Sequence, residues 1–368
     1  MQLVKTPRDN LLRPLQIVSG IVERRHTLPI LANLLIRKQG KDVSFLSTDL
    51  ELQITTTTDH GVGADEVATT VAARKLLDIL RNMPDADVSL ALSDKRLTVQ
   101  AGKSRFQLQT LAADEFPIVA QANDYAASFE LPQKVFRQLL GMVHFAMAQQ
   151  DIRYYLNGML LVVDGQKIEA VATDGHRLAY CNIKIEGAEF ARQEVIIPRK
   201  TILELQRLLE DVEDPLQIDV APSQVKFRFA DVELVSKLVE GKFPDFTRVI
   251  PTGYNKSFTI SREELHRSLQ RAAIVTSDNF KGVRFLVSEN LLKISANNTQ
   301  NEEALEEIEI DYTGESVDIG FNVTYLLDVL SNLKVEQVTV SLGDANSSAL
   351  ITLPDNDKFK YVVMPMRI

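Results

Sequence analysis

The stretch Val171-Ala172-Thr173-Asp174-Gly175-His176-Arg177-Leu178 ends an apolar, alternating run near the middle of a chain of 368 residues. Upstream, Phe45-Leu46-Ser47-Thr48-Asp49 has the same form, and its Asp49 stands 125 positions before Asp174. Downstream, Ile294-Ser295-Ala296-Asn297-Asn298 is a weaker copy, and its Asn298 stands 124 positions after Asp174. Such a period is too long for a solenoid repeat and is about one ordinary domain. The sequence therefore predicts three copies of one domain.

The copies are expected at residues 1–126, 127–253 and 254–368. Each contains short strand patterns and two helical patterns, and the six helices are expected near residues 9–22, 74–83, 132–149, 199–210, 262–271 and 324–333. We expect Asp9 to cap the first helix, with Pro14 in its first turn, and Ser261 to cap the fifth. Strands and helices in this order predict an α+β fold in which helices cover one face of antiparallel sheets.

Composition indicates a folded intracellular protein. Apolar residues make up 45% of the chain and charged residues 25%, which is typical of globular domains. The single cysteine, Cys181, excludes an intrachain disulfide and a cysteine-based metal cluster. No secretion signal or apolar run of about 18 residues is present. We therefore expect a cytoplasmic protein without a bound metal or cofactor.

The distribution of charge suggests a polyanionic partner. The net charge is −9, but the expected helices, together with the basic pairs that precede them, carry a net +7. If these helices share a surface, it attracts phosphates without reading bases. The alternative is that their Lys and Arg side chains simply face solvent.

Asp174, His176 and Arg177 could form a catalytic cluster, because a general base needs an orienting carboxylate. However, Asp49 occupies the matching place in the first copy, and no histidine follows it. The five histidines show no metal-ligand spacing, and the chain has neither a nucleophile elbow nor a P-loop. We therefore favour a surface groove lined by this turn and predict that the protein is not an enzyme.

Two further features suggest interaction surfaces. The terminal run Val362-Val363-Met364-Pro365-Met366-Arg367-Ile368 is either a last core strand or a partner-binding segment, since methionines suit adaptable pockets. A basic, apolar strand around Arg105, Phe106 and Leu108 and an acidic run from Glu302 to Glu309 are either solvated faces or complementary edges of a head-to-tail interface.

Five strings together carry a family resemblance over the whole chain. They are Arg153-Tyr154-Tyr155-Leu156-Asn157-Gly158, the turn from Thr173 to Leu178, Ser236-Lys237-Leu238-Val239 with Phe243-Pro244-Asp245, Gly282-Val283-Arg284, and the terminal run from Val362 to Arg367. The chain resembles the β subunit of bacterial DNA polymerase III, the sliding clamp family. The resemblance implies three DNA-clamp domains per chain, with antiparallel sheets outside and two helices per domain lining a ring.

In that family the ring is a head-to-tail homodimer that encircles double-stranded DNA without sequence preference. It is a processivity factor in DNA replication: it tethers the polymerase and is opened by a separate clamp loader. Other partners dock through a short linear motif, and no membrane is involved.

The resemblance also implies three sets of site residues in this sequence. The partner-peptide pocket comprises Leu156, Thr173, Gly175, His176, Arg177, Leu178, Pro244, Arg248, Val249, Phe280, Asn322, Tyr325, Ser348, Val362, Val363, Met364, Pro365, Met366, Arg367 and Ile368. The DNA-facing residues are Arg25, Arg74, Gln150, Tyr155, Arg199 and Lys200. The dimer interface pairs Lys75, Ile79, Arg105, Phe106 and Leu108 with Ile274, Val275, Glu302, Glu303, Glu306 and Glu307.

The chain departs from the family pattern at Ile368, where leucine is familiar, and at residues 23–26, in a loop that is often rich in glycine. Two other hypotheses stay open at this point. One is a monomeric scaffold of three repeats that does not encircle DNA, and the other is a hydrolase that uses His176.

Overall fold

The computed structural model describes residues 1–22, 28–185, 187, 189–277 and 280–367. It divides into two compact units. Unit 1 comprises Met1–Lys134 and Arg207–Leu238, and unit 2 comprises Val135–Gln206 and Val239–Ile368. Every ladder between named strands in the described residues is antiparallel, which agrees with the α+β prediction.

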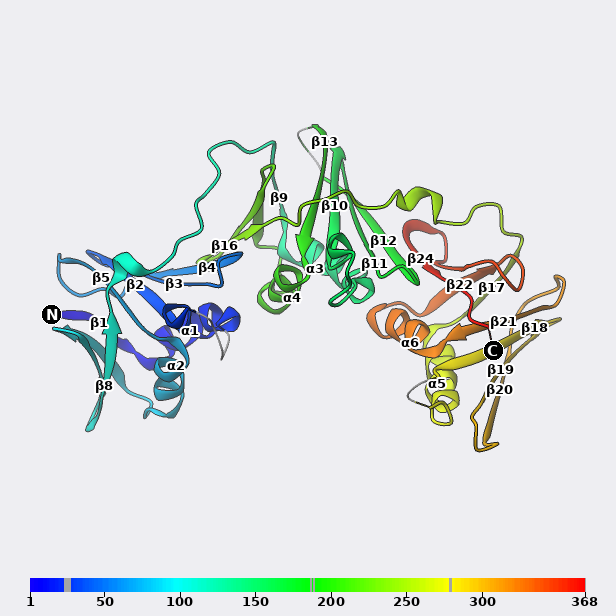
Figure 1. Ribbon diagram of the computed structural model, residues 1–368, viewed down its shortest axis with the longest axis horizontal. Helices are drawn as coiled ribbons and strands as arrows, with labels where there is room; N and C mark the ends of the chain where they lie inside the picture. Colours follow the sequence, from blue (N-terminus) through cyan, green and yellow to red (C-terminus); the bar gives the residue numbers. More distant parts are fainter. Residues whose placement is uncertain (23–27, 186, 188, 278–279, 368) are drawn as a thin grey trace. The chain divides into compact units, whose positions relative to one another are not determined.

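Unit 1 is built on a 12-stranded sheet with the order β1-β6-β7-β8-β5-β2-β3-β4-β16-β15-β14-β9. Its strands are β1 (Gln2–Pro7), β2 (Asn33–Gln39), β3 (Asp42–Thr48), β4 (Leu52–Thr58), β5 (Glu66–Ala72), β6 (Asp87–Ser93), β7 (Arg96–Ala101), β8 (Ser104–Leu111), β9 (Ala127–Pro132), β14 (Pro215–Val220), β15 (Gln224–Phe229) and β16 (Val232–Lys237). Helices α1 (Arg8–Val18) and α2 (Ala73–Asn82) pack against each other beside this sheet (Figure 1).

Unit 2 contains an 8-stranded sheet, ordered β13-β10-β11-β12-β24-β23-β22-β17, and a 4-stranded sheet, ordered β20-β19-β18-β21. Its strands are β10 (Gly158–Gly165), β11 (Lys167–Thr173), β12 (Arg177–Lys184), β13 (Phe190–Pro198), β17 (Lys256–Ser261), β18 (Gly282–Ser288), β19 (Leu291–Asn297), β20 (Glu303–Glu309), β21 (Val317–Asn322), β22 (Gln337–Leu342), β23 (Ala349–Leu353) and β24 (Asn356–Val363). Helices α5 (Arg262–Ala273) and α6 (Val323–Asn332) pack side by side within it (Figure 1).

Helices α3 (Gln133–Gly141) and α4 (Arg199–Leu208) each contain a point where the chain passes from one unit to the other. Helix α2 shows why these segments are helical: Leu76, Leu77 and Leu80 are buried on one face, while Arg74 and Lys75 are exposed. This spacing is that of an amphipathic helix on an apolar surface.

The structure contains the same turn in the first two copies. In copy one, Asp49 Oδ1 accepts hydrogen bonds from the amides of Glu51 (3.0 Å) and Leu52 (2.7 Å). In copy two, Asp174 Oδ1 accepts from the amides of His176 (2.9 Å) and Arg177 (3.1 Å). In both turns the preceding threonine hydroxyl donates to a carbonyl four residues on. The side chains required for the turn are thus those that recur in the sequence.

The Phe-Pro segments near the ends of copies one and two make matching contacts. Phe116 packs with Leu35 and Leu46 in one apolar cluster, and Phe243 packs with Leu160 and Val171 in another. Each phenylalanine anchors an otherwise irregular segment to a sheet, as expected from their matching Phe-Pro sequences.

Two helix predictions were wrong in detail. The first helix begins at Arg8 after Pro7, so Asp9 lies in its first turn and is not the cap, and Pro14 lies inside the helix. Burial of Leu11, Leu15 and Val18 stabilises this helix although Pro14 cannot donate a backbone hydrogen bond. Ser261 does cap α5, accepting from the Glu264 amide.

The predicted helix over residues 132–149 is too long. It ends at Gly141, and a separate 3-10 turn, His144–Ala146, follows it. Glycine favours the end of a helix because it has no side chain to restrict the backbone.

Candidate functional site

A rigid turn links β11 to β12 in unit 2. The Thr173 hydroxyl donates to the carbonyl of Arg177 (2.5 Å) and accepts from the Gly175 amide (3.1 Å). Gly175 has φ +89°, and a Cβ built there would lie 2.9 Å from the guanidinium of Arg153. Glycine therefore suits this position for two reasons, because it adopts a positive φ without strain and leaves room for Arg153.

Arg177 is the most tightly held side chain of this turn, and its side chain is only 10% exposed. It donates to Asp174 Oδ2 (3.1 Å), Asp328 Oδ2 (2.6 Å) and the carbonyl of Phe145 (2.9 Å). Its guanidinium carbon lies 4.5 Å from the centroid of the Tyr325 ring. Burial by itself lowers the pKa of Arg177, but Tyr361 and the two carboxylates raise it above its ordinary value. The Arg177 side chain therefore stays positively charged, and its contacts fix the orientation of the guanidinium.

The ring of His176 stacks on Tyr325, with centroids 6.4 Å apart and an interplanar angle of 20°. Asp174 does not orient this imidazole: its two oxygens accept from the backbone amides of the turn and from Arg177 Nε. The geometry of a carboxylate-oriented base is therefore absent from residues 174–177.

An apolar floor lies beside this turn. Leu156, Leu178 and Val362 belong to one buried cluster, together with Phe243 and Phe246. The segment between and after these phenylalanines exposes three predicted pocket residues, Pro244, Arg248 and Val249. The Arg248 side chain is 85% exposed and pairs only with Asp245 in the described structure (2.9 Å).

The C-terminal run divides into a core strand and a segment outside the sheet. Val362 and Val363 belong to β24 and pair with Leu178 and Arg177 of β12, so they are part of the core sheet. Beyond Val363 the backbone continues outside the sheet, where the Met364 amide donates to the carbonyl of His176 (2.9 Å). Met364 is 48% exposed. Ile368, also predicted for the pocket, lies outside the described residues.

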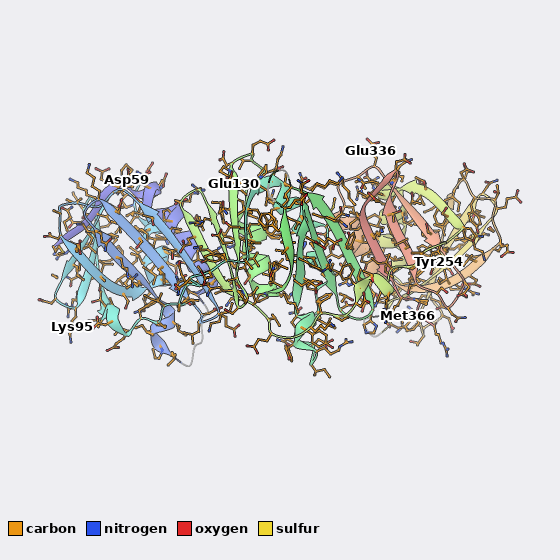
Figure 2. All side chains as sticks on the ribbon, turned by 90° about the horizontal axis from the view of Figure 1, so that it is seen from above. Asp59, Lys95, Glu130, Tyr254, Glu336 and Met366 are labelled. Atoms are coloured by element: carbon orange, nitrogen blue, oxygen red, sulfur yellow. The ribbon has the colours of Figure 1, made fainter. Side chains whose placement is uncertain are left out.

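The structure joins Tyr325, Leu156, Val362 and Met364 to the turn, and Asn322 caps the helix that carries Tyr325 by accepting from the Thr324 amide. For the predicted residues Phe280 and Ser348 the recorded contacts are to other residues. The Phe280 amide donates to Ser277, and the Ser348 carbonyl accepts from the hydroxyl of Tyr254, which is labelled in Figure 2.

A cavity of about 660 Å³ brings two of the predicted sets together. Its lining includes Gln150 and Arg199, expected to face DNA, and His176, Arg177 and Tyr325, expected to bind peptide. Burial, and next the charge of Arg177, lower the pKa of Arg199. The sequence did not identify Asp328 and Phe145, which line this cavity and hold Arg177. Asp328 is the one charged residue of α6, and a lone carboxylate in an apolar helix was the feature of the sequence that could have indicated a partner for Arg177.

The other DNA-facing predictions lie at helix starts or in loops. Arg74 donates twice to the carbonyl of Val22 (2.6 and 3.2 Å), so part of its donor capacity serves the fold. Lys200 follows Arg199 at the start of α4, and Tyr155 is half-buried against the apolar cluster. Arg25 lies outside the described residues.

The helices retain the positive charge expected of them. By formal charge α2, α3 and α4 each carry +2, α1 and α5 carry +1, and α6 carries −1. The chain as a whole carries −9. The strands and connections are therefore acidic while five of the helices are basic.

Six of the predicted dimer residues lie on two strands: Arg105, Phe106 and Leu108 on β8, and Glu303, Glu306 and Glu307 on β20. In β8, residues 104–109 pair with β7 alone, because β5 joins β8 only at Thr110 and Leu111. In unit 2, β20 is the first strand of its sheet and pairs with β19 alone. Residues 104–109 of β8 and the outer side of β20 therefore have hydrogen-bonding edges without a partner strand among the described residues, and such edges invite pairing with another chain.

These edges have complementary side chains. Phe106 is 44% exposed beside Arg105, and Leu305 is 62% exposed near Glu303. Glu306 and Glu307 pair internally, with Arg271 and Lys293. In the described structure, Arg105 and Glu303 have no recorded intrachain ion pair. Exposed Lys75 and half-buried Ile79 lie on α2, and Ile274, 80% exposed, follows α5 with half-buried Val275.

Among the described residues, no group of three or more His, Cys, Asp or Glu side chains is placed to hold a metal ion. None of the helices described is long and apolar enough to cross a membrane.

The three copies each match a domain family. Residues 2–120 match the N-terminal domain of the DNA polymerase III beta subunit, residues 130–245 its central domain, and residues 247–367 its C-terminal domain. These three matches in order define a DNA clamp. The chain belongs to the DNA polymerase III beta subunit family.

Similar proteins cover the whole chain. The beta sliding clamp of Pseudomonas aeruginosa is 45% identical over 362 residues, and that of Escherichia coli K12 is 43% identical over 364; each alignment covers 98% of both chains. The crystal structure of a sliding clamp from P. aeruginosa bound to griselimycin is 44% identical, with a TM-score of 0.96 and full coverage of both chains. The predicted fold class, three clamp domains with antiparallel sheets, is confirmed.

Proposed function

We propose that this protein is a sliding clamp in DNA replication: a homodimeric ring that encircles duplex DNA and serves as a polymerase processivity factor. The family is not one of enzymes, and the geometry of residues 174–177 agrees with a binding role. The ring slides without sequence specificity because basic helices attract phosphates and read no bases.

The observation that carries this proposal is the pair of free strand edges. In a head-to-tail dimer, β8 of one protomer pairs with β20 of its partner, and the same contact forms twice. Two sheets then become continuous, and exposed Phe106 and Leu305 leave water. Arg105 and Glu303, which lack internal partners in the described structure, supply opposite charges across the contact.

Partner proteins dock on the turn that follows β11. Leu156, Leu178 and Val362 form an apolar floor for side chains such as leucine and phenylalanine. His176 and Arg177 flank it with polar groups whose directions are fixed, and Met364 is exposed at its edge. Apolar floors with a few oriented polar groups are typical of small binding sites. We also propose that the DNA-facing residues are those named from the sequence and that the three domains span residues 1–126, 127–253 and 254–368.

We also place the protein in the cytoplasm. Its one cysteine, Cys181, is buried and unpaired, which suits a reducing compartment.

The test is the mass of the protein in solution, measured by light scattering after size exclusion at micromolar concentration. The wild type should have about twice the chain mass of 41.2 kDa. Arg105→Glu and Glu303→Arg should each weaken dimerisation by about tenfold or more, because reversal replaces an attraction by a repulsion at each of two contacts. The double variant Arg105→Glu/Glu303→Arg restores complementarity and should recover the dimer.

A wild-type protein of monomeric mass would contradict the ring and favour a three-repeat scaffold. Monomerisation by both single variants without recovery in the double variant would mean that these side chains do not meet across the interface.

A further inference from the structure

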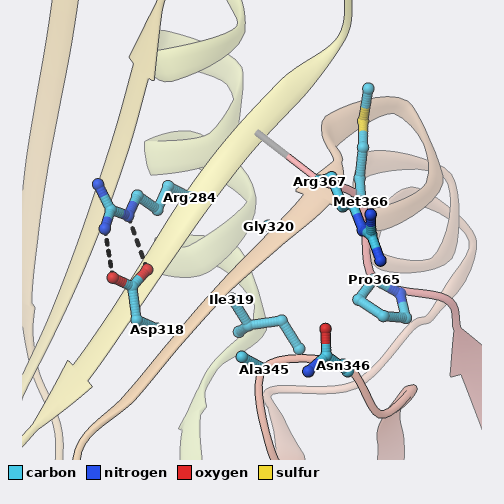
Figure 3. Close-up of a pocket in the computed structure, with 9 residues that line it drawn as sticks. All are labelled: Arg284, Asp318, Ile319, Gly320, Ala345, Asn346, Pro365, Met366 and Arg367. Carbon is cyan, nitrogen blue, oxygen red and sulfur yellow. Dashed lines mark hydrogen bonds and ion pairs between the residues drawn. The ribbon is translucent and has the colours of Figure 1, made fainter.

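A second cavity of about 440 Å³ lies against the C-terminal run, apart from the turn at residues 173–177. Three segments line it: Arg284, Asp318, Ile319 and Gly320 on β18 and β21, Ala345 and Asn346 in the β22–β23 connection, and Pro365, Met366 and Arg367 (Figure 3). We call this cavity the tail groove. It shares residues 365–367 with the predicted peptide pocket, so the two sites are continuous along the chain.

The floor of the tail groove is open because of one glycine. Gly320 pairs directly with Arg284 across β18 and β21, so a side chain at position 320 would project on the same face as Arg284. The Gly320 carbonyl accepts from the Met366 amide (2.8 Å), which fixes residues 365–367 beside β21. This backbone hydrogen bond holds one wall of the groove against β21.

Its charge is positive. Arg284 is committed to Asp318, with Nε 2.6 Å from Oδ1 and a second contact between Nη2 and Oδ2. Arg367 is exposed and, within the described residues, has no recorded ion pair. Asn346 is also exposed. Its backbone N–H donates to the Asp344 carboxylate, and its side-chain amide has no hydrogen-bond partner among the described residues. One uncompensated cation and one available amide thus face the same small space (Figure 3).

We infer that the tail groove is an accessory subsite that binds an acidic residue flanking the docking motif of a partner protein. The inference rests on the proposed peptide pocket and extends it. A carboxylate in the groove accepts hydrogen bonds from the Arg367 guanidinium and the Asn346 amide, while the Arg284–Asp318 pair stays intact. The cavity volume suits one or two residues.

The experiment compares two synthetic peptides on the full-length protein by fluorescence anisotropy. Both contain the same leucine–phenylalanine docking core, and one is flanked by three glutamates where the other has three serines. We expect the acidic flank to raise affinity about threefold to fivefold at low ionic strength, and this gain to disappear near 0.5 M salt.

Two variants locate the gain. Arg367→Gln removes the cation, and Gly320→Val fills the floor with a side chain suited to a strand; each should abolish the gain from the acidic flank. Gly320→Val should leave the serine-flanked peptide unchanged. The matched control is Lys358→Gln, which removes one exposed charge of the same sign five residues before the end of β24 and should retain the gain.

Equal binding of the two peptides to the wild type would overturn the tail groove and leave the peptide pocket intact. A gain that survives in Arg367→Gln and Gly320→Val, or that Lys358→Gln also abolishes, would show that the acidic flank responds to general surface charge. If neither peptide binds, the proposed peptide pocket fails, and the inference fails with it.

Discussion

Replacing Arg177 by methionine tests whether its ion-pair network holds the β11–β12 turn. Methionine keeps most of the length and the apolar contact with Tyr325, but it removes the donors to Asp174, Asp328 and the Phe145 carbonyl. Hydrogen bonds to charged groups contribute about 1.5–3 kcal/mol each, and a bond to a neutral carbonyl about 1 kcal/mol.

These hydrogen-bond contributions are smaller where water can solvate the carboxylates after the arginine is removed. The Asp328 side chain is 37% exposed and the Asp174 side chain 18% exposed, so both carboxylates regain some hydration when the arginine is lost. We therefore expect Arg177→Met to lower the free energy of opening of residues 171–178 by about 3 kcal/mol. Arg177→Lys keeps the charge but not the planar fork, and about half of that loss is expected.

The assay is hydrogen exchange of the peptides that cover β11 and β12, followed by mass spectrometry. It reports local opening and does not require the whole chain to unfold in one step. A loss of 3 kcal/mol corresponds to about 150-fold faster exchange. Asp328→Asn in the Arg177→Met background removes a stranded carboxylate and should recover about 1 kcal/mol.

The control is Arg248→Met, because Arg248 is 85% exposed and pairs only with Asp245 within the described residues. This variant should change the free energy of opening derived from hydrogen exchange by less than about 0.5 kcal/mol. If Arg177→Met changes exchange as little as this control does, the network does not hold the turn, and the fixed direction of Arg177 would need another cause.

Three other perturbations have defined outcomes. Gly175→Ala places a methyl group 2.9 Å from the Arg153 guanidinium at φ +89°, so it should destabilise the turn by about 1–2 kcal/mol and weaken docking peptides in the same anisotropy assay; unchanged exchange and affinity would contradict the strain. Burial raises the pKa of the Cys181 thiol to about 12, so the native protein at pH 8 should resist a disulfide-exchange reagent that labels the protein fully in urea; rapid labelling of the native protein would refute the burial. Because the thiol of the unfolded chain ionises at lower pH, the burial of Cys181 should stabilise the fold less as pH rises from about 9 towards 12. Deleting residues 364–368 should weaken docking peptides by about tenfold or more while the dimer mass is unchanged, and full affinity after deletion would remove this run from the pocket.

The threefold repeat could be predicted from the sequence because its signal is local. The Thr-Asp pairs at 48–49 and 173–174 make hydrogen bonds within four residues, so the side chains that recur are the ones that build the turn. The turn pattern needs no knowledge of the tertiary structure. The phenylalanines at 116 and 243 also recur in the sequence, but their role, anchoring a connecting segment to a sheet, depends on residues far away in the chain.

The partners of Arg177 could not be predicted in the same way. Asp328 lies 151 positions away on α6, and Phe145 contributes a backbone carbonyl that any residue could supply. The interior position of Pro14 was missed because burial of Leu11, Leu15 and Val18 outweighs a local preference against proline. In both cases tertiary packing decides, and one sequence does not show it.

Comparison of the two turns separates what the fold needs from what the site needs. Leu50 occupies the place of Gly175 and has φ +79°, so the turn itself tolerates a side chain there at some cost in strain. No guanidinium is recorded over Leu50 in the described structure, whereas Arg153 covers Gly175 and donates to the carbonyl of Asp174. Glycine in copy two therefore avoids the backbone strain that Leu50 bears and leaves room for the guanidinium of Arg153. The same reasoning applies to Arg177, whose counterpart Leu52 is buried in a strand. The two copies share the same turn, and copy two has Arg177 in the place of buried Leu52, with its guanidinium bonded to Asp328 of α6.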